Sequence, residues 1–184
     1  MRTILFMILF FCLIFQNNVM AQNADSLNIK KEYKHSFDIS PMSPLFNIWA
    51  IQYSYQFSPK NEIILGLAYA NIKYAEGRSH APTLMIGYRR FLWKGLHLEY
   101  QLWPAYNSYY ENIEQKYYNG FELWNEFRAG YLIDFKLGNL PLYINPQLLC
   151  GFGLYPGNKP ESFKQHIKDE FFFIYPNIFL GFKF

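Results

Sequence analysis

Apolar and polar residues alternate with a period of two through most of this chain, and most clearly in its last fourteen residues. Between Phe171 and Phe184 every even-numbered position is apolar, whereas the odd-numbered positions include Asn177, Gly181 and Lys183. Successive side chains of a β-strand point to opposite faces. The pattern therefore predicts a strand with one apolar and one mixed face that runs to the C-terminal residue.

Seven segments upstream show the same period, which predicts eight strands in total. Phe57 is expected to pair with Asn61 across a three-residue turn, because this pairing brings the apolar faces of two neighbouring strands to one side. The expected strands are 33–40, 47–57, 61–74, 82–92, 96–105, 120–135, 140–154 and 171–184.

The predicted connections alternate in length along the chain. Turns of three or four residues follow the second, fourth and sixth strands, and connections of about seven to fifteen residues follow the third, fifth and seventh. The connection at 107–119 is dense in tyrosine, and the one at 155–169 is rich in charge. Three prolines fall on the apolar face inside strands, where we expect β-bulges because proline cannot donate to a ladder: Pro104, Pro146 and Pro176.

Residues 1–21 have the pattern of a cleavable secretory signal. Arg2 precedes an apolar run from Ile4 to Phe15, and the small residue Ala21 stands where a signal peptidase cuts. The run is too short to span a bilayer as a helix, although an uncleaved anchor is an alternative. We therefore expect a signal peptide at 1–21 and a single domain at 22–184.

Composition narrows the class of protein further. Aromatic residues make up 21% of the chain and charged residues 17%, and the net charge of +3 gives no reason to expect a nucleic-acid partner. Only Cys150 remains after the predicted signal, so an internal disulfide is not possible.

An even number of strands, short turns on one side, long loops on the other and a C-terminal aromatic residue resemble small bacterial outer-membrane β-barrels of OmpA- and OmpX-like architecture. The resemblance implies an all-β, eight-stranded antiparallel up-and-down transmembrane barrel with short periplasmic turns and longer extracellular loops. It implies location in the bacterial outer membrane, with membrane lipid as a partner. It also implies that Phe182 and Phe184, in the C-terminal strand, form an assembly signal for the barrel-assembly machinery.

A secreted soluble barrel of the lipocalin type is the competing interpretation. Its outer face would meet water and should be rich in Lys, Glu and Thr. The less apolar face here instead carries residues such as Ala50, Ser54, Gly66 and Ala68, which suit a narrow interior.

Charged side chains of several strands share this less apolar face. The interior of an eight-stranded barrel is just wide enough for side chains, so opposite charges there are expected to pair. Arg89 is expected to lie across from His97 and diagonal to Glu99. A proton or ion path is the alternative, and no cofactor or metal is expected because only one histidine lies on this face. The predicted polar network of the lumen comprises Arg89, His97, Glu99, Glu122, Glu126, Arg128 and Gln147.

These patterns favour a structural or surface-interaction barrel. Tyrosine provides large contact area at low entropic cost, so the segments 107–119 and 155–169 are candidates for contact with an extracellular partner. A narrow channel or carrier for small solutes is one alternative. The other is a lipid-modifying enzyme of the outer leaflet, for which a nucleophile and a base could meet at the rim, although no catalytic residue is predicted. The rim candidates are Ser79, His80, Ser162, His166 and Asp169.

Overall fold

Antiparallel strands account for most of the described chain. The computed structural model describes residues 33–161, 163–165 and 172–184, so the predicted signal peptide at 1–21 lies outside the described residues. The elements are β1 (His35–Ile39), the 3-10 helix η1 (Ser43–Phe46), β2 (Ile48–Ser58), β3 (Asn61–Lys73), β4 (Gly77–Trp93), β5 (Leu96–Glu111), β6 (Lys116–Tyr131), β7 (Ile133–Leu137), β8 (Leu140–Tyr155) and β9 (Phe172–Lys183).

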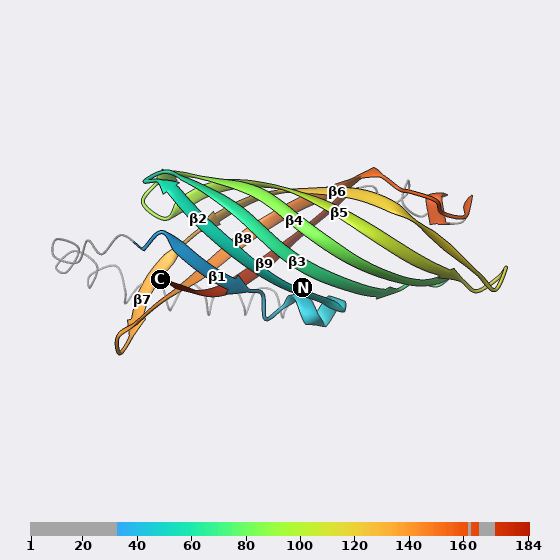
Figure 1. Cartoon of the computed structure of the whole chain (residues 1–184), viewed down its shortest axis with the longest axis horizontal. Coiled ribbons are helices and arrows are strands. Elements are labelled where there is room, and N and C mark those ends of the chain that lie inside the picture. The colour runs from blue at the N-terminus through green and yellow to red at the C-terminus, as the bar shows by residue number, and fades with distance from the viewer. Residues whose placement is uncertain (1–32, 162, 166–171) are drawn as a thin grey trace, which may run out of the picture. The chain divides into compact units, whose positions relative to one another are not determined.

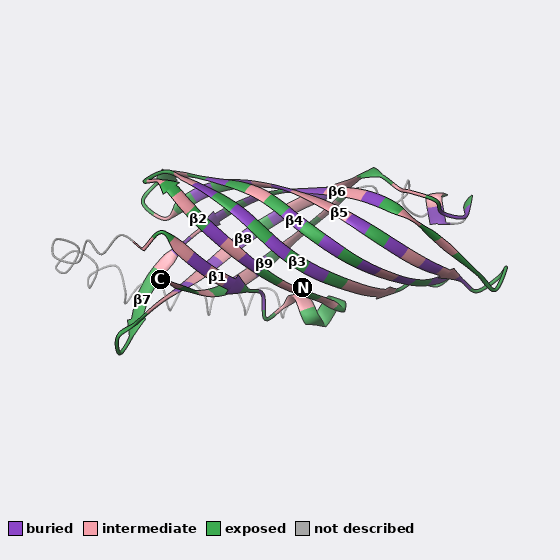
Figure 2. Ribbon diagram, in the orientation of Figure 1, coloured by how far each residue is buried: buried purple, intermediate pink, exposed green. Residues whose placement is uncertain are grey.

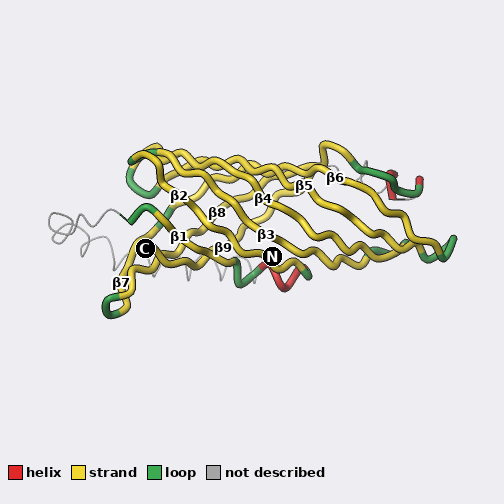
Figure 3. The backbone as a smooth tube through the Cα atoms, in the orientation of Figure 1, coloured by secondary structure: helices red, strands yellow, loops and turns green. Residues whose placement is uncertain are grey.

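Except for β6 and β7, each strand pairs with its neighbour in the chain, and two further pairings close a ring (Figure 1). β1 pairs with β9 and β6 pairs with β8, which gives a closed cycle of eight hydrogen-bonded strands. β7 continues the line of β6 beyond Leu132 and pairs with β8, so β6 and β7 together form the predicted strand 120–135. The all-β class, the up-and-down order and the eight antiparallel strands are therefore confirmed (Figure 3).

The ring closes with a stagger of ten residues. One row of paired residues starts at Phe37 and ends at Phe172, whereas Phe37 itself pairs with Phe182. A stagger of this kind requires the strands to tilt, by about 35–45° in rings of this size, and leaves an interior that side chains can fill. The full row is Phe37, Tyr53, Leu65, Ile86, Leu102, Asn125, Phe152 and Phe172.

Most polar side chains of the strands point into the ring, together with a few apolar ones such as Ile64, Met85 and Leu149, and the outward-pointing side chains are largely apolar. Burial alternates residue by residue along the strands (Figure 2). In β3, Glu62 and Gly66 are buried while Leu65 and Leu67 are 47% and 65% exposed. This arrangement is the reverse of a water-soluble fold, in which large apolar residues are mostly inside. The predicted assignment of faces is confirmed on these strands.

The short turns are shorter than predicted, and two long connections are largely strand. Residues 59–60, 94–95 and 138–139 are two-residue turns, and these turns define what we call the short-turn end of the ring. The prediction of a loop at 107–119 is wrong. β5 and β6 remain paired with each other as far as the pair Glu111 with Lys116, which leaves only 112–115 as a turn. Cross-strand tyrosine pairs and an opposite-charge pair, both stabilising in sheets, extend this hairpin.

The bulges expected at the three prolines are also absent, since no register shift occurs at any of them in the ladders of the described strands. Pro104 lies where the β4–β5 ladder is interrupted, between the pairs of Leu102 and Ala105. Pro146 lies where β8 passes from β6 to β7, and Pro176 lies above the last pair between β9 and β1. Each proline therefore has one flank without a ladder partner among the described strands, so its missing N–H breaks no ladder bond.

The two ends of the described chain meet at the short-turn end. The Phe184 N–H donates to His35 O at 2.9 Å and the His35 N–H donates to Phe184 O at 3.2 Å. The rings of Phe182 and Phe184 point outward and pack against Phe37. The two predicted assembly-signal residues thus lie where the last strand pairs with the first. No helix in the described ranges is long and apolar enough to cross a bilayer.

Candidate functional site

Five charged side chains of alternating sign contact one another in a line across the interior of the ring. They lie nearer to its short-turn end. Arg89 donates to Glu62 Oε2 at 2.8 Å and to Glu99 Oε2 at 2.7 Å. Arg128 lies 3.1 Å from Glu99 Oε1 and 2.6 Å from Glu126 Oε2. All five side chains are at most 8% exposed and come from four consecutive strands, β3 to β6. We call this set the ion cluster.

Glu99 is the centre of the ion cluster. Besides both arginines, its carboxylate accepts hydrogen bonds from Gln101 Nε2 at 2.6 Å and from Gln147 Nε2 at 3.3 Å. Gln101 also donates to Gln52 Oε1 of β2 at 2.6 Å, so the polar contacts reach across the interior. A buried carboxylate with this many donors is stabilised in its charged form by geometry as well as by opposite charge.

The predicted position of His97 is corrected by the register. Arg89 pairs directly with Glu99, and His97 pairs with Phe91 instead. The partner of Arg89 lies two residues beyond His97 along β5, so the prediction that placed His97 opposite Arg89 and Glu99 diagonal to it was wrong. His97 Nδ1 contacts Gly95 O at 3.0 Å and its Nε2 contacts Gln147 Nε2 at 3.2 Å, which links it to the network through Gln147.

Glu122 is the one predicted network residue that lies apart from the ion cluster. It accepts hydrogen bonds from Asn107 Nδ2 at 2.8 Å and Trp124 Nε1 at 3.2 Å. Its Oε1 also lies 2.6 Å from Lys159 Nζ. Burial lowers the pKa of Lys159, and the Glu122 carboxylate opposes that shift. Glu122 therefore belongs to the end of the ring opposite the short turns.

A second polar group fills the interior near the short-turn end. The Tyr143 hydroxyl donates to Asp38 Oδ2 at 2.7 Å and lies 3.4 Å from Ser36 Oγ. Asp38 and Glu62 are buried on the inner faces of β1 and β3, and the predicted network did not include them. The shared period of two was the signal that could have added both residues.

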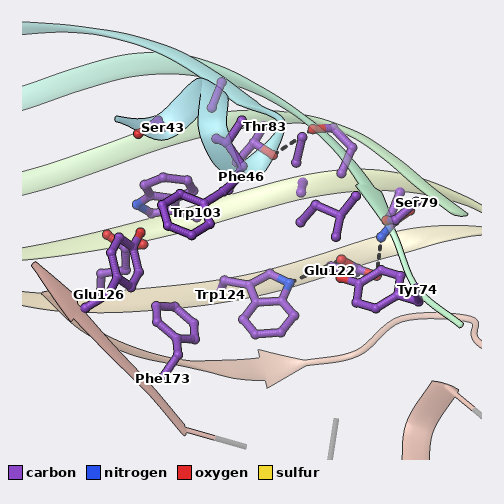
Figure 4. A pocket seen from close by; sticks show the side chains of 18 of the residues that line it. Ser43, Phe46, Tyr74, Ser79, Thr83, Trp103, Glu122, Trp124, Glu126 and Phe173 are labelled. Atoms are coloured by element: carbon purple, nitrogen blue, oxygen red, sulfur yellow. Dashed lines mark hydrogen bonds between the residues drawn. The ribbon is translucent and has the colours of Figure 1, made fainter. Parts of the chain in front are cut away.

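Between the ion cluster and the opposite end lies a cavity of about 540 Å³ (Figure 4). This volume is within the range of small-molecule sites, roughly 300–1,000 Å³. Its lining combines aromatic side chains, among them Trp103, Trp124, Phe173 and Tyr175, with small side chains and with the carboxylates of Glu122 and Glu126. The small side chains are those of Ala68, Ala70, Ala81, Thr83 and Ala105.

Residues of the 155–169 connection cover the cavity at the end opposite the short turns. Phe163 is 2% exposed and its ring lies 4.5 Å from that of Tyr109 and 5.1 Å from that of Tyr74. Lys159 lies near the rings of Tyr109 and Phe163 while it pairs with Glu122. We call Lys159 and Phe163, with the rings they contact, the cap. Nothing in the sequence of this connection predicted that Lys159 and Phe163 would be buried.

The candidate rim residues do not come together in the described chain. Ser79 points inward and donates to Asn107 Oδ1 at 2.7 Å, whereas His80 lies on the outer face and contacts the Tyr69 hydroxyl at 2.9 Å. Ser162, His166 and Asp169 lie outside the described residues. Among the residues that the structure describes, no group of three His, Cys, Asp or Glu side chains could hold a metal ion.

No protein-family model matches this chain, and neither a curated protein nor a solved structure matches it.

Proposed function

We propose that this chain is an outer-membrane β-barrel with a sealed, non-conducting interior and an outer end that contacts other molecules. Cleavage after Ala21 would release the mature chain, with the short-turn end in the periplasm. The outward faces of the ring support the membrane location, because they carry Leu and Ile side chains that are 40–65% exposed, among them Leu67, Ile86 and Leu98. Such a surface suits hydrocarbon and not water.

Exposed aromatic side chains support the same location. Trp49, Tyr106, Phe121 and Phe172 lie toward the end of the ring opposite the short turns, and a second set lies toward the short-turn end. Aromatic residues in membrane barrels gather at the two interfaces with water. The second set comprises Tyr55, Phe57, Trp93, Phe135, Phe182 and Phe184.

The ion cluster is the observation that carries the sealed interior. Its alternating charges satisfy one another at 2.6–3.1 Å and leave little of any side chain exposed. Neighbouring glycines leave room for this packing: a Cβ on Gly130 would lie 2.7 Å from Gln147 Cγ and 2.8 Å from His97 Nε2. Ions pass a pore when they bind weakly and leave, and charges locked in mutual pairs do not provide such sites.

Planar-bilayer recording of the purified full-length protein tests the proposal. We expect no steady conductance from the wild-type barrel or from Glu126→Gln, because the glutamine side chain would still fill the interior. Steady wild-type conductance with an ion selectivity that Glu126→Gln shifts would show a channel and overturn the sealed interior.

The surface-interaction role belongs to the tip of the β5–β6 hairpin. Ile113 is 80% exposed and Tyr117 is 61% exposed, at the end of the longest ladder of the ring. Cells that display the double variant Ile113→Ser, Tyr117→Ser should adhere less than wild-type cells to a surface that wild-type cells bind. The two kinds of cell are compared at the same amount of displayed barrel. Equal adhesion would remove the tip from this role.

A further inference from the structure

We infer that the cavity above the ion cluster binds a single hydrocarbon chain of an amphiphile, which enters sideways from the membrane through a gap between β2 and β9. The inference rests on the membrane location proposed above. Three features support it: an incomplete wall, an apolar cavity closed at both ends, and an apolar outer surface at the opening.

The gap exists because β1 is much shorter than its neighbours. The last pair of β1 with β9 is Ile39 with Leu180, and the last pair with β2 is Ile39 with Ile51. β9 continues from Leu180 back to Phe172, and β2 continues from Ile51 back to Ile48, with no strand between them in the described chain.

Residues 40–47, which include η1, occupy this gap without forming a strand, and at their end the Asn71 N–H of β3 donates to Asn47 O at 2.9 Å. No backbone hydrogen bond links them to β9 among the described residues. The contacts across the gap are side-chain contacts: Ser40 Oγ donates to Asn177 Oδ1 at 2.5 Å, and the ring of Phe46 lies 5.9 Å from that of Tyr175. Side-chain contacts can break and reform at lower cost than a ladder of backbone bonds, so this seam is the part of the wall best suited to open.

The cavity reaches the seam. Its lining includes Phe46 of η1 and Phe172 of β9, both of which are 53% exposed, together with the inward-facing Trp103 and Trp124. Figure 4 shows Phe46 projecting from η1 toward Trp103. One residue of the gap therefore borders both the interior and the outer surface.

Both other ends of the cavity are closed by described residues. Trp103 Nε1 donates to Gln101 Oε1 at 2.8 Å and thereby packs the floor against the ion cluster. Phe163 and Tyr109 of the cap are 2% and 0% exposed. A ligand from water would have to displace the cap, whereas a ligand from the membrane would have to displace only the seam.

The lining and the outer surface together favour an apolar chain. Alanines and aromatic rings make up much of the lining and offer dispersion contact. Its two carboxylates, Glu122 and Glu126, are already paired with Lys159 and Arg128. Outside the seam, Leu45 is 76% exposed and Ile174 is 62% exposed. A hydrocarbon chain can thus pass from bilayer to cavity without crossing water, which makes it a better occupant than a polar solute.

Tryptophan fluorescence tests the inference, because the chain has four tryptophans, two outside and two at the cavity. In vesicles of dibromostearoyl phosphatidylcholine, bromine should quench Trp49 and Trp93 of the wild-type protein. The variant Trp49→Phe with Trp93→Phe retains only Trp103 and Trp124, and its emission reports the cavity. We expect that emission to fall as well.

The choice of brominated probe distinguishes two sources of the bound hydrocarbon chain. Loss of interior emission in the dibrominated phospholipid identifies an acyl chain of bilayer lipid. Loss only after dibromostearic acid is added to unbrominated vesicles identifies a free fatty acid. Quenching of the outer tryptophans but not of the inner ones by either probe would overturn the inference and leave the membrane location standing. Failure to quench the outer tryptophans would overturn the membrane location itself.

Filling the cavity provides the matched control. Ala81→Phe, added to the two-tryptophan variant, should abolish interior quenching, whereas Ala129→Phe on the outer face of β6 should not. Heat-modifiable migration on a gel shows whether each variant folds, and Ala68→Leu replaces Ala81→Phe if the latter does not. Quenching that survives a folded, filled variant contradicts binding in this cavity.

The sideways route has its own test in a Cys150→Ser background. A bifunctional thiol reagent that joins Phe46→Cys to Tyr175→Cys should slow the onset of interior quenching. The same reagent on Leu67→Cys and Leu84→Cys, a paired couple in the intact β3–β4 ladder, should leave the onset unchanged. Equal onset in both cross-linked proteins would show that the chain enters elsewhere.

Discussion

Arg89 and Glu99 face each other across the β4–β5 ladder, and Arg89 Nε donates to Glu99 Oε2 at 2.7 Å inside the ring. The same carboxylate also holds Arg128, so two arginines depend on one residue. Replacing Glu99 removes one carboxylate partner from each arginine. The loss of a partner of a buried charge lowers the stability of the folded state. We therefore expect Glu99 to contribute more to stability than Glu62 or Glu126, the two ends of the ion cluster.

Glu99→Gln should lower the free energy of unfolding in urea by up to about 3–5 kcal/mol, the usual cost of breaking a buried ion pair. Glu62→Gln, which removes a partner from one arginine only, should cost less. Asp134→Asn removes an exposed pair with Lys183 and should cost no more than about 1 kcal/mol. Equal losses in Glu99→Gln and Asp134→Asn would show that the ion cluster does not stabilise the barrel.

Much of this interior could be predicted from the sequence, because a period of two assigns every residue of a strand to a face. Arg89, Glu99, Glu126 and Arg128 were placed on one face in this way, and a ring of eight strands brings that face together. The ladder between β2 and β3 also follows the predicted register, as the pair Tyr55 with Ile63 shows. Only its tip differs, where the register shifts between Gln56 and Ser58.

What failed depends on contacts between distant segments. The extent of the β5–β6 hairpin depends on cross-strand pairs such as Tyr110 with Tyr117. Because the segment around these residues is polar and lacks a clear period of two, its sequence alone predicts a loop. The position of Lys159 depends on Glu122, thirty-seven residues earlier in the chain. The first strand was expected to end at 40, but no local pattern shows that a segment containing η1, and not a further strand, follows it beside β9.

Proteolysis of intact cells should cut the β5–β6 hairpin only at its turn. Glu114 is exposed in the turn 112–115, and the residues on either side of this turn, Glu111 and Lys116, are paired in the ladder. A glutamate-specific protease should therefore cut after Glu114 and spare Glu111, which is buried. Trypsin should leave Lys94 intact, because its two-residue turn would lie in the periplasm. Cleavage at Lys94 in intact cells with Glu114 protected would reverse the topology.

Removal of Phe184 should impair assembly more than loss of its ring alone. The deletion removes both backbone hydrogen bonds to His35 where β9 meets β1, whereas Phe184→Ala keeps them and loses only the ring contacts with His35, Phe37 and Phe182. We expect the folded fraction, measured by heat-modifiable migration, to fall in the order wild type, Phe184→Ala, deletion. Deletion of 23–28 serves as a control and should have no effect. Equal folded fractions in all four proteins would remove the assembly-signal role of this residue.

Lys159 should make the stability of the barrel rise with pH. Burial lowers its pKa below the ordinary 10.5, so below that pH the unfolded chain binds its proton more tightly than the folded barrel does. In the window between the lowered pKa and 10.5 the unfolded state carries more protons, and the free energy of unfolding increases with pH. Lys159→Met should remove this slope in urea titrations, and Lys164→Met should retain it. An unchanged slope in Lys159→Met would assign the pH dependence to other groups.

Gly181→Ala should destabilise the barrel, because the interior has no room for a side chain at this position. A Cβ there would collide with the ring of Tyr143 and lie 2.6 Å from the backbone Phe37 O of the neighbouring strand. The carbonyl cannot move without breaking the ladder between β1 and β9, so we expect a loss of about 1–3 kcal/mol in urea unfolding, the usual cost of overpacking. Gly153→Ala is the matched control: its Cβ would meet Trp124 no closer than 3.4 Å, an ordinary contact, and should cost less. If both variants unfold at the same urea concentration, the close packing between Tyr143 and the first and last strands does not stabilise the barrel.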